Sequence, residues 1–141
     1  MAANEKLSEQ YVLYQILAQN LEMLKQQLQF VEQQMLELRS TLMSIDDVKK
    51  MGEKNEILLP LGSGCYGSGS ITDRGRILVN AGAGIFINEE ISSAKALLEQ
   101  RAGEAERAGK EVQQQAEKII AQMNEIALVI EEAARKEGGK P

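Results

Sequence analysis

The chain has 141 residues, a formal net charge of −5, no histidine, no tryptophan and 4% aromatic residues. Its length fits one domain, and the Gln, Glu, Lys, Ala and Leu that dominate both ends are typical of long helices and coiled coils. Without histidine, the commonest general base and metal ligand is missing, and no basic stripe points to nucleic acid. We therefore expect no enzyme, no bound cofactor or metal, and no nucleic-acid partner.

One cysteine, Cys65, cannot form an intrachain disulfide, and no histidine is present to activate it as a nucleophile. The N-terminus lacks a secretory pattern, and no apolar run is long enough to span a membrane. These features predict a soluble, cytoplasmic protein with no membrane partner.

The first part of the chain carries apolar residues at alternating steps of three and four, uninterrupted by Gly or Pro. With Leu7 on the same frame, these positions are Tyr14, Leu17, Leu21, Leu24, Leu28, Val31, Met35, Leu38, Leu42 and Ile45. A repeat sustained in this way predicts the seam of a coiled coil. Lys49 and Lys50 suit the last turn, and Gly52 is a plausible cap, so we expect a helix from about residue 5 to 50.

The middle of the chain predicts two β-hairpins. Ile57–Leu61 reads as a short strand whose proline suits an edge, and Tyr66–Thr72 as its return strand across a Gly-Ser-Gly turn. Residues 72–75 read as a turn. Ile77–Asn80 and Ile85–Asn88 then flank Ala-Gly-Ala-Gly, a strong hairpin sequence.

The first of these turns contains a literal G-x-G-x-x-G, formed by Gly62, Gly64 and Gly67. In a dinucleotide-binding site this motif must be followed by a helix whose N-terminus receives the pyrophosphate. Here the glycines lead instead into Ser-Gly-Ser-Ile-Thr and another turn, and no Gly-Lys-Ser/Thr of a P-loop is present. We interpret the glycines as those of a hairpin turn and of a strand on which another backbone packs closely.

The last third of the chain repeats the steps of three and four. These positions are Leu98, Ala102, Ala105, Gly109, Val112, Ala116, Ile119, Met123, Ile126, Ile130 and Ala133. Asn88 is the expected N-cap of this second helix, with Glu89 and Glu90 in its first turn, and the helix should run from about 89 to 136. In an antiparallel pair, residues whose numbers add up to about 139 would face each other, which places Met35 and Val31 against the small residues Ala105, Ala108 and Gly109.

The expected fold is mainly α with a small β region: a long antiparallel two-helix coiled coil with two central β-hairpins that join an oligomeric β-barrel. We expect one domain, with the first helix in 1–52, the hairpins in 53–88 and the second helix in 89–137. Small sheets with apolar edges are marginal alone, and we expect that a long helix pair cannot cover the hairpins because it points away from them. Assembly through the hairpins is therefore favoured over a monomer in which the helices curl over the sheet. The expected assembly residues are Ile57, Leu59, Leu61, Ile77, Val79, Ile85 and Ile87.

The whole chain resembles the alpha subunit of archaeal prefoldin. The resemblance is carried by the order helix, hairpins, helix and by the segments Leu-Pro-Leu-Gly-Ser-Gly and Val-Asn-Ala-Gly-Ala-Gly around residues 59–64 and 79–84. It implies a hexamer with two alpha and four prefoldin beta-type subunits on a double β-barrel. It also implies binding of unfolded client proteins between the arm tips and their transfer to a group II chaperonin, without ATP. Residues 66–70 depart from the family, which more often has bulkier strand residues there.

Surplus apolar residues gather off the seam where the start of the first helix and the end of the second would meet. Together with Leu7, which lies on the seam frame, the candidate client-binding residues are Tyr11, Val12, Leu13, Ile16, Ala127, Leu128 and Val129. Exposed apolar patches commonly mark interaction sites, although these residues could instead pack within the arm or against a neighbouring one. Met23 and Phe30 are expected to pack along the arm. The alternative function is a scaffolding coiled-coil protein with one defined partner.

Overall fold

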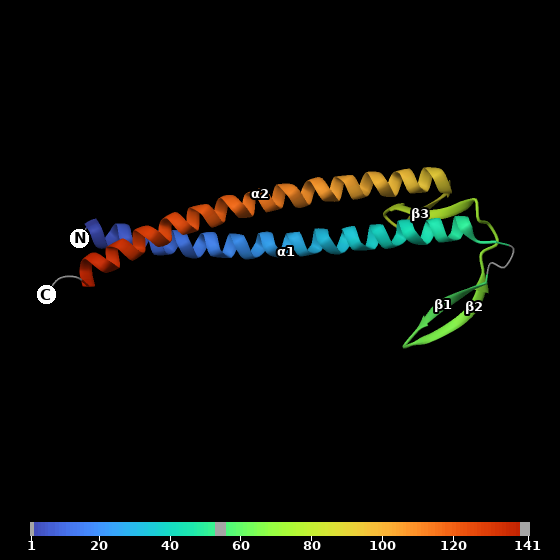
Figure 1. Ribbon diagram of the computed structural model, residues 1–141, viewed down its shortest axis with the longest axis horizontal. Helices are drawn as coiled ribbons and strands as arrows, with labels where there is room; N and C mark the ends of the chain where they lie inside the picture. The colour runs from blue at the N-terminus through green and yellow to red at the C-terminus, as the bar shows by residue number, and fades with distance from the viewer. Residues whose placement is uncertain (1, 53–55, 139–141) are drawn as a thin grey trace. The chain divides into compact units, whose positions relative to one another are not determined.

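The computed structural model describes residues 2–52 and 56–138. Along the chain, helix α1 (Ala2–Lys50) is followed by four strands and then by helix α2 (Ile91–Gly138) (Figure 1). The strands are β1 (Glu56–Gly62), β2 (Cys65–Ser70), β3 (Arg76–Gly82) and β4 (Ile85–Glu90). The expected order of helix, two hairpins and helix is confirmed.

Helix α1 begins and ends close to the expected residues, and Lys49 and Lys50 lie in its last turn. Helix α2 begins at Ile91, so the expectation that it starts near Glu89 with Asn88 as N-cap is wrong. Asn88 pairs with Leu78 in the β3–β4 ladder, which continues through Glu90. The main-chain N–H of Ile91 donates to the oxygen of Gly75 at 3.0 Å, so a carbonyl satisfies this donor without a side-chain cap.

The four strands form two separate antiparallel sheets of two strands each, β1–β2 and β3–β4. Each hairpin closes with a two-residue loop, Ser63-Gly64 or Ala83-Gly84, whose residues all have positive φ, between 51° and 80°. Positive φ at both loop positions is the geometry of a type I′ turn, whose twist matches that of the flanking strands. The predicted hairpin turns are therefore confirmed, and Gly62 and Gly64 belong to the first of them.

The two hairpins repeat each other at an interval of 20 residues, a feature that the sequence reading missed. Ile57 pairs with Gly69 in the first hairpin, and Ile77 pairs with Glu89 at the same register in the second. Both ladders also shift register at the same place, just before the turn. The shared sequence is short, Ile-Leu-(Leu/Val)-x-x-Gly-x-Gly, and is visible only when residues 57–64 are aligned with 77–84.

The chain divides into two compact units. Unit 1 contains residues up to 33 and from 105 onward, so it joins the first part of α1 to the last part of α2. Its helices are antiparallel, because Val31 approaches Gly109 whereas Tyr11 and Tyr14 share a groove with Ala127 and Ile130. The expected facing of Val31 with Ala108 and Gly109 is confirmed, since Val31 and Ala108 also line one groove.

Unit 2 contains residues 34–104, with the end of α1, both hairpins and the start of α2. Its core is formed by Ile45, Ile91 and Leu98, against which Leu38, Leu42, Val48 and Ile77 pack. An ion pair between Lys95 and Asp46, 3.2 Å from Nζ to Oδ1, joins the two helices beside this core. The second hairpin is held to α2 by a hydrogen bond from the Arg101 guanidinium to the oxygen of Asn80 at 3.0 Å.

Both predicted seams are confirmed within these units. Every apolar residue assigned to the first seam is buried or half-buried, and the same holds for every residue assigned to the second. Their off-seam neighbours are mostly exposed and polar. The heptad pattern therefore identifies the packed face of each helix correctly.

Candidate functional site

The first candidate surface lies on α1, close to its N-terminus. Tyr11, Val12, Leu13 and Ile16 expose 51%, 52%, 44% and 48% of their surface. With the seam residues Tyr14 and Leu17 at positions a and d of the heptad, Val12 falls at f and Ile16 at c, both on the outer face. These side chains are therefore not seam residues, and the helix pair of unit 1 does not bury them.

The matching residues of α2 lie near its C-terminal end. Ala127 is exposed, and Leu128 and Val129 expose 60% and 51% of their surface, whereas their seam neighbours Ile126 and Ile130 are buried or half-buried. Ile120, one of the off-seam apolar residues, is also exposed at 43%. Within unit 1, exposed apolar side chains thus occur on both helices near the chain ends.

A groove brings the two sets together. Its lining combines one aromatic face of α1 with small and apolar residues of α2, and its volume is about 260 Å³. The lining residues are Tyr11, Tyr14, Ala127, Ile130, Glu131 and Ala134. Its one charged residue, Glu131, pairs with Arg135 at 3.1 Å. We call the exposed residues Tyr11, Val12, Leu13, Ile16, Ala127, Leu128 and Val129 the terminal apolar surface.

Leu7 differs from the other residues that the sequence placed in this set. It is half-buried and falls on the seam frame, one heptad before Tyr14. Leu7 is therefore less exposed than the other residues of this set.

A second groove in unit 1 corrects two expectations. It has a volume of about 530 Å³ and is lined by Met23, Gln26, Gln27, Phe30, Val31, Ala108 and Val112. Phe30 and Met23 expose 61% and 58% of their surface, so the expectation that they pack along the arm is wrong. Both fall at heptad position c, on the outer face, which the seam of the helix pair does not cover.

The residues expected to drive assembly divide between the two hairpins. In the first hairpin Ile57 is half-buried, and Leu59 and Leu61 expose 45% and 72% of their surface. The side chain of Leu59 lies across the opposite strand: a Cβ atom added to Gly69 would lie 2.8 Å from Leu59 Cδ1. The expectation that another backbone packs on these glycines is wrong, because the nearest atoms at Gly67 and Gly69 belong to the side chains of Leu61 and Leu59 on the paired strand.

In the second hairpin the helices of unit 2 cover part of the sheet. Val79 is buried, and Ile77 packs against the core around Ile45. The expectation that the helices cannot cover the hairpins is therefore wrong for this one, because its β3 strand folds back beside them. Ile85 and Ile87 remain exposed at 61% and 45%.

Four large exposed side chains in the hairpins were missed by the sequence reading. They are Leu58, Tyr66, Leu78 and Phe86, each between 60% and 70% exposed. In a strand, successive side chains point to opposite faces, so consecutive apolar residues make both faces apolar. The runs Ile-Leu-Leu, Ile-Leu-Val and Ile-Phe-Ile carried that signal.

Within residues 2–52 and 56–138, no three His, Cys, Asp or Glu side chains gather in a way that could hold a metal ion. Neither long helix, over its described residues, is apolar enough over a sufficient length to cross a bilayer.

The chain is a coiled-coil helix pair with two hairpins inserted between its helices. Both the helices and the hairpins expose apolar side chains. These features define a class of assembly-forming coiled-coil subunit. The prefoldin subunit family model matches residues 17–136. This match covers most of the chain, and the chain belongs to the prefoldin family, a family of chaperone subunits.

Two relatives support this assignment. The chain is 30% identical to the prefoldin subunit alpha of Pyrococcus horikoshii over 139 residues, covering 97% of this chain and 94% of the relative. It is 32% identical to the prefoldin subunit alpha of Methanoculleus marisnigri over 117 residues, covering 83% and 78%. The sequence resemblance to the archaeal alpha subunit is thus confirmed.

The fold is similar to a solved structure as well. A chain of filamentous PFD from Methanocaldococcus jannaschii, determined by cryo-electron microscopy, aligns with a TM-score of 0.70 at 18% identity. The alignment covers 86% of this chain and 98% of that one. At this identity the likeness supports the fold.

Proposed function

We propose that this chain is the alpha-type subunit of an ATP-independent chaperone that binds unfolded polypeptides and prevents their aggregation. The observation that carries the proposal is the terminal apolar surface: large apolar side chains on both helices that stay exposed outside a well-packed seam. Exposed patches of this kind favour contact with other apolar chains. Several arms in one complex would bind one client through many weak contacts acting together.

We further propose that assembly proceeds through the hairpins, with two alpha and four prefoldin beta-type subunits. Within residues 2–52 and 56–138 each sheet has two strands, so each strand has one edge without a partner strand there, and Leu61, Ile85 and Phe86 are at least 60% exposed. An isolated two-stranded hairpin is marginally stable in water, so pairing with strands of partner subunits would stabilise both hairpins of this chain. Transfer of clients to a group II chaperonin belongs to the same proposal and rests on family membership.

The test replaces two outer-face residues of the terminal apolar surface, in the double variant Val12→Gln, Leu128→Gln. Glutamine is a good helix former, so helicity should not change. Each lost apolar contact is worth about 1 kcal/mol for a side chain that is already half exposed, so client affinity per arm should fall roughly thirtyfold. Suppression of aggregation is measured with two unrelated denatured proteins, for the complex with beta-type subunits.

The matched control is Leu36→Gln, Met43→Gln, which removes two apolar residues of α1 that are 65% and 68% exposed. The control should protect both clients as well as the original chain does. Equal protection by the terminal variant and the control would contradict client binding at the terminal apolar surface. Protection of neither client by the unmodified complex would favour the scaffolding alternative.

A further inference from the structure

The segment between the two hairpins is tied to the ends of both helices. Residues 71–75 connect β2 to β3, and Asp73 Oδ1 accepts a hydrogen bond from the main-chain N–H of Gly75 at 2.9 Å. This contact fixes the expected turn at 72–75. Asp73 is followed by Arg74 and Gly75. The Arg74 guanidinium binds the chain at the end of α1, and the Gly75 oxygen binds the start of α2.

Arg74 binds the chain just beyond the end of α1. Its guanidinium donates from Nη1 to the main-chain oxygens of Met51 and Gly52, the latter at 2.8 Å. Met51 and Gly52 directly follow the last residue of α1, so these oxygens lie next to the negative end of the helix dipole, where a cation is favourable. Arg74 is 23 positions from Met51 and 22 positions from Gly52 in the sequence. The whole β1–β2 hairpin lies between Arg74 and these two residues.

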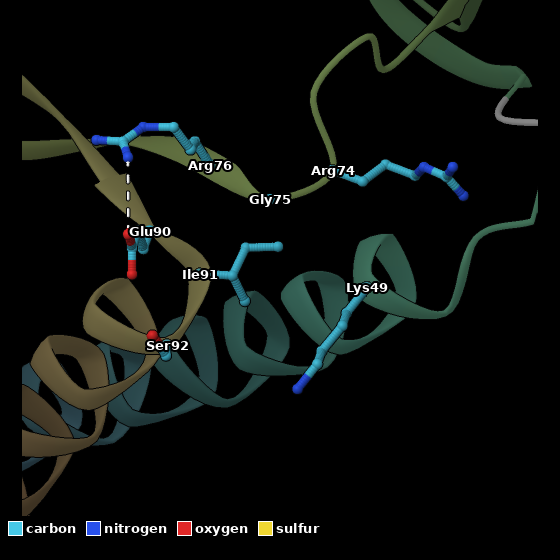
Figure 2. A pocket seen from close by; sticks show the side chains of 7 residues that line it. All are labelled: Lys49, Arg74, Gly75, Arg76, Glu90, Ile91 and Ser92. Atoms are coloured by element: carbon cyan, nitrogen blue, oxygen red, sulfur yellow. Dashed lines mark ion pairs between the residues drawn. The ribbon is translucent and has the colours of Figure 1, made fainter.

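Gly75 binds the beginning of α2, since its oxygen accepts the N–H of Ile91. Arg76, the next residue, donates to the oxygen of Asn88 at 2.8 Å and lies 4.0 Å from Glu90. Figure 2 shows Arg74 and Arg76 extending in opposite directions from Gly75, with the ion pair to Glu90 on the Arg76 side. Three consecutive residues therefore hold the end of α1, the start of α2 and the end of β4.

We infer that Arg74 is a positioning residue for assembly: by binding Met51 and Gly52 it closes the base of the β1–β2 hairpin and holds this hairpin in the orientation in which it meets partner strands. The inference rests on the proposed assembly through the hairpins. β1 and β2 pair only with each other among the described strands, so their orientation depends on the chain at their base. Closing a loop of this length restricts where the hairpin can point.

The identity of the residue matters because two carbonyls are bound. Both are bound by Nη1, whose two N–H groups are fixed in the plane of the guanidinium, whereas the lysine ammonium is a compact point charge on a flexible stem. Lysine at position 74 should therefore retain only part of the effect. A neutral glutamine should lose nearly all of it.

The experiment compares Arg74→Gln and Arg74→Lys with the control Arg39→Gln, which removes the same charge from an exposed position of α1 in unit 2. Spin labels are placed on Cys65, which is exposed in the first hairpin, and on a cysteine introduced by Glu99→Cys in α2. The full chain is measured by double electron–electron resonance. Association with a beta-type subunit is followed by stopped flow, and helicity by circular dichroism.

For Arg74→Gln we expect a label-to-label distance distribution at least twice as broad and an association rate about tenfold lower, with unchanged helicity and dissociation rate. A hairpin that samples many orientations meets its partner correctly in a smaller fraction of encounters. Arg74→Lys should give intermediate values, and Arg39→Gln should match the original chain.

An unchanged distribution in Arg74→Gln would overturn the inference, and so would a broad distribution with an unchanged association rate. If the unmodified chain fails to associate with beta-type subunits at all, the proposed assembly is rejected and with it the positioning role. The distance measurement then still shows separately whether Arg74 restrains the hairpin.

Discussion

Two glycines inside α2 show how single residues tune the packing of this chain. A Cβ atom added to Gly109 would lie 3.3 Å from Val31 Cγ1, which is closer than ordinary contact. A Cβ atom added to Gly103 would meet nothing within 4 Å. Both glycines lower helix stability, but only Gly109 allows a large side chain of α1 to approach the α2 backbone.

This difference predicts that Gly103→Ala and Gly109→Ala act unequally. Alanine in a helix is favoured over glycine by about 1 kcal/mol. We expect Gly103→Ala to raise the free energy of unfolding by about that amount, and Gly109→Ala to raise it clearly less because Val31 must move. Urea denaturation of the full chain, followed by circular dichroism, measures both. Equal stabilisation by the two substitutions would contradict the close packing at Gly109.

At the scale of elements, the local sequence predicted the hairpins and turns but not which sheet face is covered. The type I′ turns follow from short Gly-containing loops, a local property of the chain. The coverage of Ile77 and Val79 depends on the end of α1 and the start of α2, which are distant in sequence. The start of α2 also moved from the expected Glu89 because β4 pairing and the Gly75 carbonyl, both outside the helix, decide where strand becomes helix.

The exposed side of the second hairpin predicts an assembly defect. Ile85→Glu, Ile87→Glu places two charges on side chains that are 61% and 45% exposed, so the chain should fold with unchanged helicity. Strand pairing with partner subunits would then bury those charges, which is strongly unfavourable. We expect native mass spectrometry of a mixture with beta-type subunits to show only unassembled chains.

The control Leu36→Glu, Met43→Glu adds the same charge to exposed positions of α1 in the same unit and should assemble normally. A hexamer from the hairpin variant, or loss of the hexamer in the control, would count against assembly through this face.

At the scale of the whole molecule, the proposed roles fall in different units. The terminal apolar surface belongs to unit 1, whereas the hairpins and the Arg74 contacts belong to unit 2. Unit 2 has its own core around Ile45, Ile91 and Leu98 and its own ion pair between Lys95 and Asp46. Client binding and assembly should therefore be separable by mutation.

Removing residues 1–16 together with 124–141 tests this separation. The truncation deletes the terminal apolar surface and leaves all of unit 2 intact. We expect assembly with beta-type subunits to persist by native mass spectrometry, and protection of denatured clients from aggregation, measured by light scattering, to be abolished. Undiminished protection by the truncated complex would place client binding elsewhere on the molecule.

The sequence alone determined the helices, their seams, their antiparallel facing and the positions of the hairpin turns. The helices, seams and turns arise from the heptad period and from glycine-containing loops, so they depend on residues close to each other in the chain. The facing follows from folding two helices of similar length back on each other about the middle of the chain. The off-seam apolar residues near the chain ends were also identified this way, and the family resemblance followed from the same segments.

Only the tertiary structure decided the rest. It showed that the helices of unit 2 cover Ile77 and Val79 of β3, that Phe30 and Met23 are exposed, and that Arg74 and Gly75 bind the chain at the two helix ends. Each of these depends on which distant segment lies opposite a residue. Periodicity and turn propensity describe a residue's own element, so they carry no information about that neighbour.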